Sequence, residues 1–168
     1  HQNLISLNPC LGKPGGDCRT ICKTPMLYRF ALQADFSVRH WENNNIQAYD
    51  SATAGNSALL AALHRNLHLE IAYWKGWYAA CLLNDYTKFF DTMNIPILIK
   101  KSIDVDFPIR ESALALQQHL APRVIQVNGF SSRPINIWKS ILAGCKYSIP
   151  FTKVDLQEYM FYLCTQHS

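Results

Sequence analysis

Two acidic residues and an aromatic pair lie close together in residues 84–91, whose sequence is Asn-Asp-Tyr-Thr-Lys-Phe-Phe-Asp. Asp85 follows the apolar run 77–83, which has the composition of a buried strand. A carboxylate at the end of a strand can bind a hard cation, because Mg²⁺ prefers carboxylate, phosphate and water oxygens. The alternative is that Asp85 caps the following helix and that Asp91 is solvated, which is the usual role of an isolated Asp.

A second group of possible ligands is the imidazole pair His64 and His68, four residues apart on a predicted helix. That spacing places both rings on one helix face, where they could bind Zn²⁺. Arg65 occupies the position of the Glu in the His-Glu-x-x-His motif, and the sequence shows no third ligand. An exposed polar helix face is therefore the favoured interpretation.

The six cysteines include no Cys-x-x-Cys pair, and we expect reduced thiols. Cys81 and Cys145 could act as nucleophiles, but a cysteine in an apolar segment is more often a buried thiol. Four aromatic residues surround Lys75, namely Tyr73, Trp74, Trp77 and Tyr78. They could stack on single-stranded bases. Packing where a helix meets a strand is the favoured interpretation.

The composition is that of a folded protein. Of the 168 residues, 49% are hydrophobic and 17% are charged, which excludes intrinsic disorder. The length fits one domain or two small lobes. A net charge of +4 is compatible with a polyanionic partner, but it is weaker than the charge of a dedicated DNA-binding tail.

The first half of the chain is predicted to contain a hairpin and two helices. Strands at residues 4–7 and 18–22 flank a turn rich in Pro and Gly, and a helix follows over residues 26–34. The polar region 41–50 is predicted to be a loop. A longer helix begins at Ser51 or Ser57 and ends at Gly76.

The second half alternates strands and helices without a strict βαβ period, so we predict the α+β class. We expect a strand at 77–83, helices near 95–103 and 108–120, a hairpin that begins at residues 123–127, and a last helix after Ser148. No apolar run reaches the length of a membrane helix, and the first residues do not resemble a secretory signal. We expect an intracellular protein, not bound to a membrane, that is part of a longer polypeptide.

Three motifs in order resemble reverse transcriptases. The segment from Asp85 to Asp91 is similar to the palm pattern Asp-x-x-x-x-Phe-Asp. Upstream, residues 7–29 (LNPCLGKPGGDCRTICKTPMLYR) resemble the fingers hairpin of the non-LTR and group II intron branches, in which a Lys-Pro-Gly turn precedes Arg-Pro-Ile and Tyr-Arg. Downstream, residues 140–151 (SILAGCKYSIPF) resemble the motif Gly-x-x-Gln-Gly-x-x-x-Ser-Pro. The resemblance covers nearly the whole chain.

The resemblance implies part of a right-hand polymerase, with helices packed on a small antiparallel sheet. Residues 1–75 would be a fingers-like region, and residues 76–168 a partial palm with inserted fingers helices. The implied activity is RNA-directed DNA polymerisation, in which a primer 3′-hydroxyl attacks the α-phosphate of a deoxynucleoside triphosphate with the help of two metal ions. The implied partners are an RNA template, a DNA primer and deoxynucleotides.

Site residues follow from the motif positions. The resemblance makes Asp85 the catalytic ligand of Mg²⁺ or Mn²⁺, assisted by the backbone carbonyl of Tyr86. Phe90 takes the place of the steric gate that excludes a 2′-hydroxyl. Lys13 and Arg19 match the fingers residues that bind the triphosphate, as a point charge and a bidentate fork.

The last motif implies roles in contacting the nucleotide and the template. Gly144 would let the backbone approach the nascent base pair, Ser148 would support that turn, and Ala143 stands at a position of template or primer support. The sequence departs from the family at three positions. Thr20 replaces Pro, Ser140 replaces Gly, and Ala143 replaces Gln.

The second metal site of the family needs an Asp-Asp pair beyond the last motif, and the chain contains no such pair. Asp104 and Asp106 lie between the motifs, in the wrong order, and are predicted to be in a solvated loop. The metal site would be completed only by residues beyond Ser168, so we expect this segment alone to be inactive. The alternative function is a non-catalytic nucleic-acid-binding or interaction module derived from such a polymerase.

Overall fold

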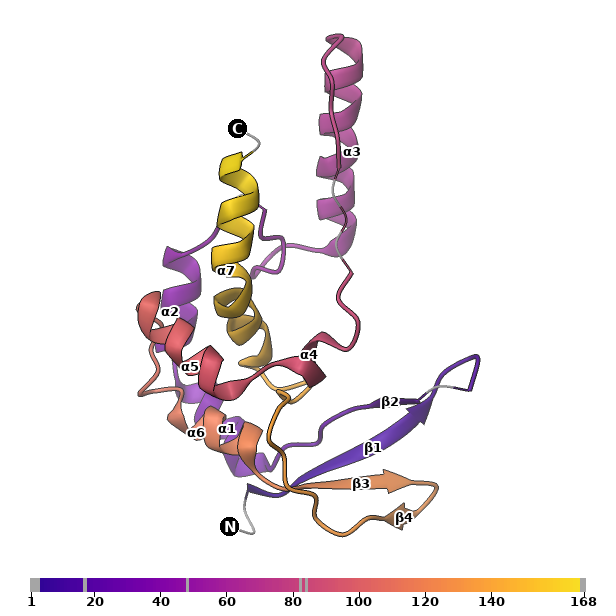
Figure 1. The fold of residues 1–168 in the computed structure, drawn as a ribbon, viewed down its shortest axis with the longest axis vertical. Helices are drawn as coiled ribbons and strands as arrows, with labels where there is room; N and C mark the ends of the chain where they lie inside the picture. The colour runs from indigo at the N-terminus through magenta and orange to yellow at the C-terminus, as the bar shows by residue number, and fades with distance from the viewer. Residues whose placement is uncertain (1–3, 17, 48, 82, 84, 167–168) are drawn as a thin grey trace. The chain divides into compact units, whose positions relative to one another are not determined.

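The computed structural model describes residues 4–16, 18–47, 49–81, 83 and 85–166. Within these ranges the chain is an α+β protein with seven helices and one four-stranded sheet. It forms two compact units (Figure 1), one made of residues 1–41 together with 88–168 and the other of residues 42–87. The division into a fingers-like region and a partial palm at residue 75 concerns function and stays a prediction.

The sheet belongs to the first unit and is mixed. Its strands are β1 (Ser6–Gly12), β2 (Cys18–Thr20), β3 (Arg123–Val127) and β4 (Phe130–Ser131), in the order β2-β1-β3-β4 (Figure 1). The two hairpins are antiparallel, whereas β1 and β3 run parallel. The expectation of an antiparallel sheet is therefore wrong for the central pair. A hairpin turn can join only antiparallel strands, and β1 and β3 are joined by a long connection that returns the chain in the same direction.

Both predicted hairpins are present, but the first strand runs over Ser6–Gly12 rather than residues 4–7, and the second ends at Thr20 rather than at residue 22. In the first, Cys10 lies opposite Thr20 and Gly12 lies opposite Cys18. In the second, Asn128 and Gly129 have φ angles of 48° and 84°. Two consecutive positive φ angles are what a type I′ turn requires, and Asn-Gly is the dipeptide that adopts them most readily.

The helices of the first unit surround one hydrophobic core. They are α1 (Met26–Ala34), α4 (Phe89–Thr92), α5 (Ile95–Asp104), α6 (Ala113–Leu120) and α7 (Ser148–Gln166). The expected helix at 108–120 begins later, at Ala113. Leu32, Leu98 and Phe151 are among the buried residues at the centre.

Helix α2 (Ser37–Asn44) replaces the first part, residues 41–44, of the loop predicted for residues 41–50. Val38 and Trp41 are buried in the core, and the indole Nε1 of Trp41 donates to the carbonyl of Val105 over 3.0 Å. The asparagines that follow carry a turn signal, but burial of these two side chains outweighs that local preference.

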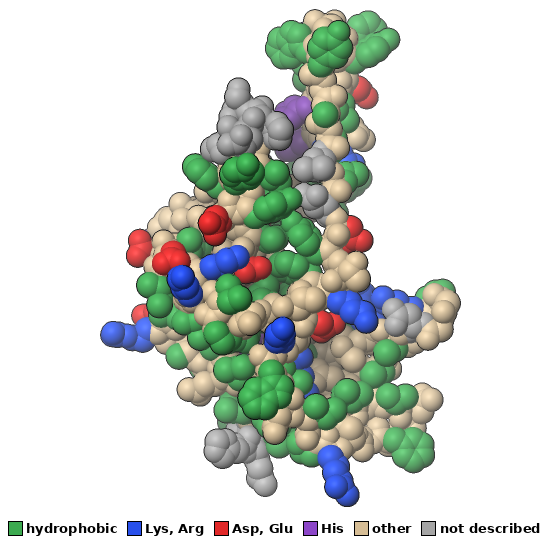
Figure 2. Space-filling model, in the orientation of Figure 1, with side chains coloured by type: hydrophobic (Ala, Val, Ile, Leu, Met, Phe, Trp, Pro, Cys, Tyr) green, Lys and Arg blue, Asp and Glu red, His purple; other side chains and the backbone are tan. Residues whose placement is uncertain are grey.

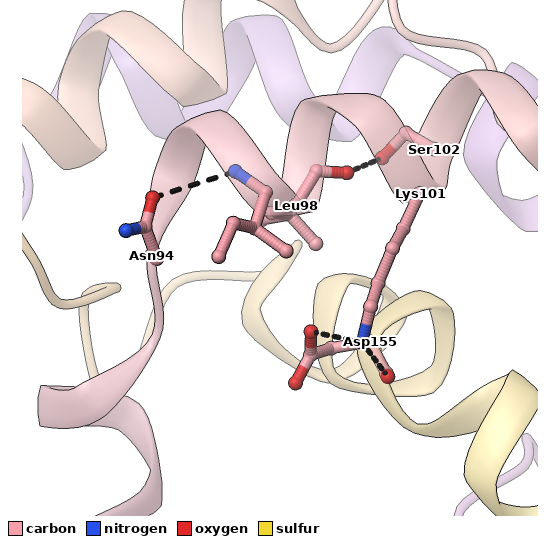
Figure 3. Close-up of polar contacts among 6 residues, drawn as sticks. Asn94, Leu98, Lys101, Ser102 and Asp155 are labelled. Carbon is pink, nitrogen blue, oxygen red and sulfur yellow. Dashed lines mark hydrogen bonds and ion pairs between the residues drawn. The ribbon is translucent and has the colours of Figure 1, made fainter.

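Helices α5 and α7 are joined by polar contacts as well as by the core (Figure 3). The Nζ of Lys101 donates to the carboxylate Oδ1 of Asp155 over 2.9 Å and to its backbone carbonyl over 2.7 Å. The Oδ1 of Asn94 accepts from the amide of Ile97 at the start of α5, as a helix N-cap does.

The second unit contains α3 (Ala58–Trp74). Ser57 caps its N-terminus by accepting from the amide of Leu60, and Gly76 follows its end with a φ of 67°. The prediction of a buried strand over 77–83 is wrong. The described residues of this run are exposed and in no strand, and no strand lies in the described part of this unit that could pair with them.

None of the helices in the described ranges is long and apolar enough to cross a membrane.

Candidate functional site

Segments from two of the three motifs meet next to α4. The amide of Ile141 donates to the carbonyl of Phe90 over 2.8 Å, and the amide of Ser140 donates to the carbonyl of Met93 over 2.9 Å. Backbone hydrogen bonds do not depend on side-chain identity, so Ser140 makes this bond although its φ of 105° is one that Gly adopts more readily.

The end of the first hairpin reaches the same place. The amide of Cys22 donates to the carbonyl of Ala143 over 3.2 Å. Gly144 has a φ of 98°, and a Cβ at this position would lie 3.7 Å from the carbonyl oxygen of Cys22. Cys22, residues 90–93 and residues 140–148 therefore form one contiguous region, which we call the motif junction.

Ser148 holds the turn within the motif junction. Its Oγ donates to the carbonyl of Leu142 over 2.5 Å, and its amide donates to the carbonyl of Cys145 over 3.1 Å. The side chain is buried at the start of α7. Tyr147 is also buried, and its hydroxyl donates to a carboxylate oxygen of Asp35. The turn is thereby fixed from two sides.

A half-buried arginine adjoins the motif junction from β3. The guanidinium of Arg123 donates to the Oγ of Ser140 over 2.9 Å and to its carbonyl over 3.0 Å. The Oγ of Ser140 in turn lies 3.4 Å from the Oδ1 of Asp91. Burial lowers the pKa of Arg123, and the nearby Cys22 and Asp91 oppose that shift. Arg123 stays charged, because an arginine is not deprotonated in a protein.

The sequence did not single out Arg123 as a site residue, because a lone Arg at the start of a strand has no motif. The same holds for His119, which is fully buried in α6. Its Nδ1 accepts from the amide of Leu142 over 2.9 Å. Burial, together with the positive charge of Arg123, lowers the pKa of His119 to about 3. The imidazole is therefore neutral at neutral pH.

Cys145 lies on the inner side of the motif junction. Its Sγ is 2.9 Å from the hydroxyl of Tyr28, and both side chains are buried. Burial raises the pKa of the Cys145 thiol, although hydrogen bonds from Tyr28 and Ser148 act against that shift. A buried thiol with a raised pKa is a poor nucleophile, which favours a packing role.

Lys13 and Arg19 lie on the same hairpin, and both are exposed. Lys13 opens the turn, where its carbonyl accepts from the amide of Gly16 over 3.2 Å, and Arg19 pairs with Leu11. The hairpin thus carries both predicted triphosphate-binding residues. Thr20 lies in β2 opposite Cys10.

Asp85 and Tyr86 belong to the unit formed by residues 42–87. Both are exposed and lie outside any helix or strand. The strand expected to end at Asp85 is not formed, so its carboxylate is not delivered by a sheet. Phe90, by contrast, is partly buried against the core of the first unit. Asp91 is exposed.

The described residues do not complete a metal site. Among them, no three His, Cys, Asp or Glu side chains are grouped so as to hold an ion. His64 and His68 are exposed on α3, and Asp104 and Asp106 are exposed at the end of α5. Asp85 alone supplies one carboxylate, which does not fit a site for two cations.

Comparison with models of known protein families gave no match, and comparison with curated proteins gave none.

Proposed function

We propose that the chain is the fingers and first part of the palm of a reverse transcriptase of the non-LTR or group II intron type. The observation that supports this most is the motif junction. The three segments that resemble the family are far apart in the sequence, and the first unit joins the end of the first hairpin, Phe90 and the turn at Gly144 by backbone hydrogen bonds. A nucleotide pocket built from these motifs requires that the three segments lie next to one another.

In this proposal each residue has a separate task. Lys13 and Arg19 bind the triphosphate from the exposed hairpin, as a point charge and a fork. Phe90 limits the space beside the sugar. Gly144 keeps the backbone open to the base pair, because its positive φ and missing Cβ suit a close approach. Asp85, which belongs to the other unit, supplies one carboxylate for Mg²⁺ or Mn²⁺.

The decisive experiment measures binding of a fluorescently labelled deoxyadenosine triphosphate, in Mg²⁺, by anisotropy. We expect the reduced chain to bind it at low ionic strength and Arg19→Gln to weaken binding about tenfold, because a charge-assisted pair is lost. Arg39→Gln is the matched control, since Arg39 is an exposed arginine on α2. Absence of binding, or equal weakening by both variants, would contradict the proposal.

A second candidate function is binding of single-stranded nucleic acid without catalysis. The supporting observation is the aromatic set Tyr73, Trp74, Trp77 and Tyr78, which is exposed rather than packed. Hydrophobic side chains gather over the end of α3 (Figure 2). Trp74 is 83% exposed, and the Nζ of Lys75 lies 4.4 Å from the centroid of the Trp77 ring. Exposed rings beside a cation can stack on bases.

This second function is tested by filter binding of single-stranded RNA. Trp74→Ala should weaken binding about fivefold or more, because stacking contributes about 1–3 kcal/mol per base. Trp138→Ala is the control, since Trp138 is equally exposed at 84% but lies in the other unit. Binding that survives Asp85→Ala and falls with added salt would favour this function over polymerisation.

A further inference from the structure

Two cysteines face each other diagonally across the first hairpin. In the register of β1 and β2, Cys10 lies opposite Thr20 and Gly12 lies opposite Cys18. Residues opposite each other, and residues two apart in one strand, share a face of the sheet. Cys10 and Cys18 are therefore on the same face, one diagonal step apart. Neither sulfur is in a disulfide, Cys18 is exposed and Cys10 is partly exposed.

The surroundings leave room for the two sulfurs to approach. Diagonal neighbours in an antiparallel pair are about 7–8 Å apart, and a disulfide needs about 4.4–6.8 Å between Cα atoms. Gly12 is the residue directly opposite Cys18, and a Cβ at Gly12 would meet nothing within 4 Å. Gly12 has no side chain that could stand between the cysteines. If their two Cα atoms move closer by roughly 1 Å, the sulfurs come within bonding range.

We propose that Cys10 and Cys18 form a redox-active dithiol, which oxidised glutathione closes to a disulfide across the hairpin. Cys18 is the more exposed thiol, so its thiolate attacks glutathione disulfide and releases one reduced glutathione. The Cys10 thiolate then attacks the Cys18 sulfur of the mixed disulfide and releases the second. Two thiols lose two protons and two electrons, and one glutathione disulfide becomes two reduced glutathione molecules.

The pKa shift of Cys10 agrees with an order in which Cys18 attacks first and Cys10 second. Burial and the neighbouring Cys18 sulfur raise the pKa of the Cys10 thiol. Cys10 is therefore the poorer first attacker and acts as the resolving thiol. The closed loop would contain Lys13, and Arg19 follows Cys18 directly. Oxidation thus restricts the two residues proposed to bind the triphosphate, although the dithiol itself does not depend on that function.

The test is incubation of the reduced full chain with oxidised glutathione, followed by alkylation and tryptic peptide mapping. Trypsin does not cut between Lys13 and Pro14, so both cysteines stay in the peptide of residues 1–19. We expect this peptide to carry no alkyl group and to weigh two hydrogen atoms less than its unmodified sequence. In Cys10→Ser the same peptide should instead gain one glutathione at Cys18, while Cys81→Ser, which removes an exposed cysteine elsewhere, should leave the internal disulfide unchanged.

Three results would overturn the proposal. In the first, the peptide of residues 1–19 stays reduced while Cys81 is modified. In the second, Cys18 of the unsubstituted chain accumulates glutathione and no disulfide to Cys10 forms. In the third, the loss of two hydrogen masses persists in Cys10→Ser. These results concern only the hairpin, so they are distinguishable from a failure of triphosphate binding in the reduced chain.

Discussion

At the scale of single residues, the motif junction depends on two buried polar residues, Ser140 and His119, and on the half-buried Arg123. Arg123, Ser140 and His119 hold the turn before α7 through hydrogen bonds to its backbone and to one another. The Nε2 of His119 is buried and has no partner among the described residues. A second proton on this ring would place a charge in the core beside Arg123, which explains the low pKa.

The buried imidazole of His119 should make the stability of the first unit depend on pH. Its pKa is about 3 when folded and about 6.5 when unfolded, so below pH 6.5 the unfolded chain binds more protons. Stability is therefore complete above that pH and falls as the pH is lowered toward 3. Between pH 7 and pH 5 the loss from His119 is about 2 kcal/mol.

Urea unfolding at the two pH values checks this prediction. His119→Asn keeps an oxygen acceptor for the amide of Leu142 but does not titrate, so the loss between pH 7 and pH 5 should shrink by about 2 kcal/mol. His64→Asn, on the exposed face of α3, should leave the loss unchanged. An equal pH dependence in His119→Asn and the unsubstituted chain would contradict the assignment.

Gly144 gives a second prediction at this scale. Its φ of 98° is strained for any residue with a Cβ, so Gly144→Ala should lower the free energy of unfolding by about 1–2 kcal/mol. Gly12→Ala is the control, because Gly12 has open space around it and no positive φ. Thermal unfolding of both variants is the measurement, and a neutral Gly144→Ala would show that the turn relaxes.

The steric-gate role of Phe90 is tested by nucleotide discrimination. Phe90→Val removes the ring that would meet a 2′-hydroxyl, so the affinity for adenosine triphosphate should approach that for its deoxy form in a competition experiment. Phe89→Val is the matched control, since Phe89 is also partly buried against the core. A Phe90→Val variant that still rejects the ribonucleotide would refute the gate.

At the scale of elements, α5 and α7 show how a polar pair adds to a hydrophobic contact. The ion pair of Lys101 and Asp155 is only partly exposed, at 30% and 24% of the two side chains. Lys101→Met should therefore cost about 0.5–1 kcal/mol of unfolding free energy, and less at high salt. Lys100→Met is the control on the same helix, since Lys100 is exposed. Denaturant titration at two salt concentrations measures both, and an equal effect of the two variants would contradict the role of the pair.

Strand β1 buries its polar face rather than its apolar one. Its apolar residues suggested a strand, yet Ser6 and Asn8 face the interior while Leu7 is exposed. A shift of one residue moves every side chain of a strand to the other face. The parallel pairing with β3 aligns Ser6 with Arg123, and this register decides which face is buried.

At the scale of the whole molecule, the core of the first unit is assembled from two separate stretches of chain. Residues 1–41 contribute Cys22, Tyr28, Leu32, Val38 and Trp41, and residues 88–168 contribute the rest of the buried cluster. The intervening residues 76–81 are exposed and outside helices and strands. Exposed irregular segments are where proteases cut first.

Limited trypsin digestion should therefore cut after Lys75 before it cuts at Lys100 or Lys101 inside α5. The two products should elute together in native gel filtration, because the shared core still joins residues 1–41 to residues 88–168. They should separate in a denaturing gel. Lys75→Gln should slow the first cut. Early cleavage within α5, or products that separate under native conditions, would contradict this organisation.

The sequence by itself determined the local elements whose signals lie within a few residues. Ser57 and Gly76 delimit α3, Asn128-Gly129 forms the second hairpin, and Pro and Gly form the first turn. Caps and turns depend on the φ angles and hydrogen bonds of adjacent residues, so they can be read from neighbours in the chain.

Only the tertiary structure decided which distant residues meet. The parallel pairing of β1 with β3, the helix at residues 37–44 and the contacts of Arg123 and His119 all depend on partners far along the chain. The run at 77–83 has the composition of a buried strand, but no strand in the described part of its unit pairs with it. Composition gives a residue's preference for burial, whereas packing decides whether a partner is present, because backbone pairing and desolvation are properties of both sides of a contact.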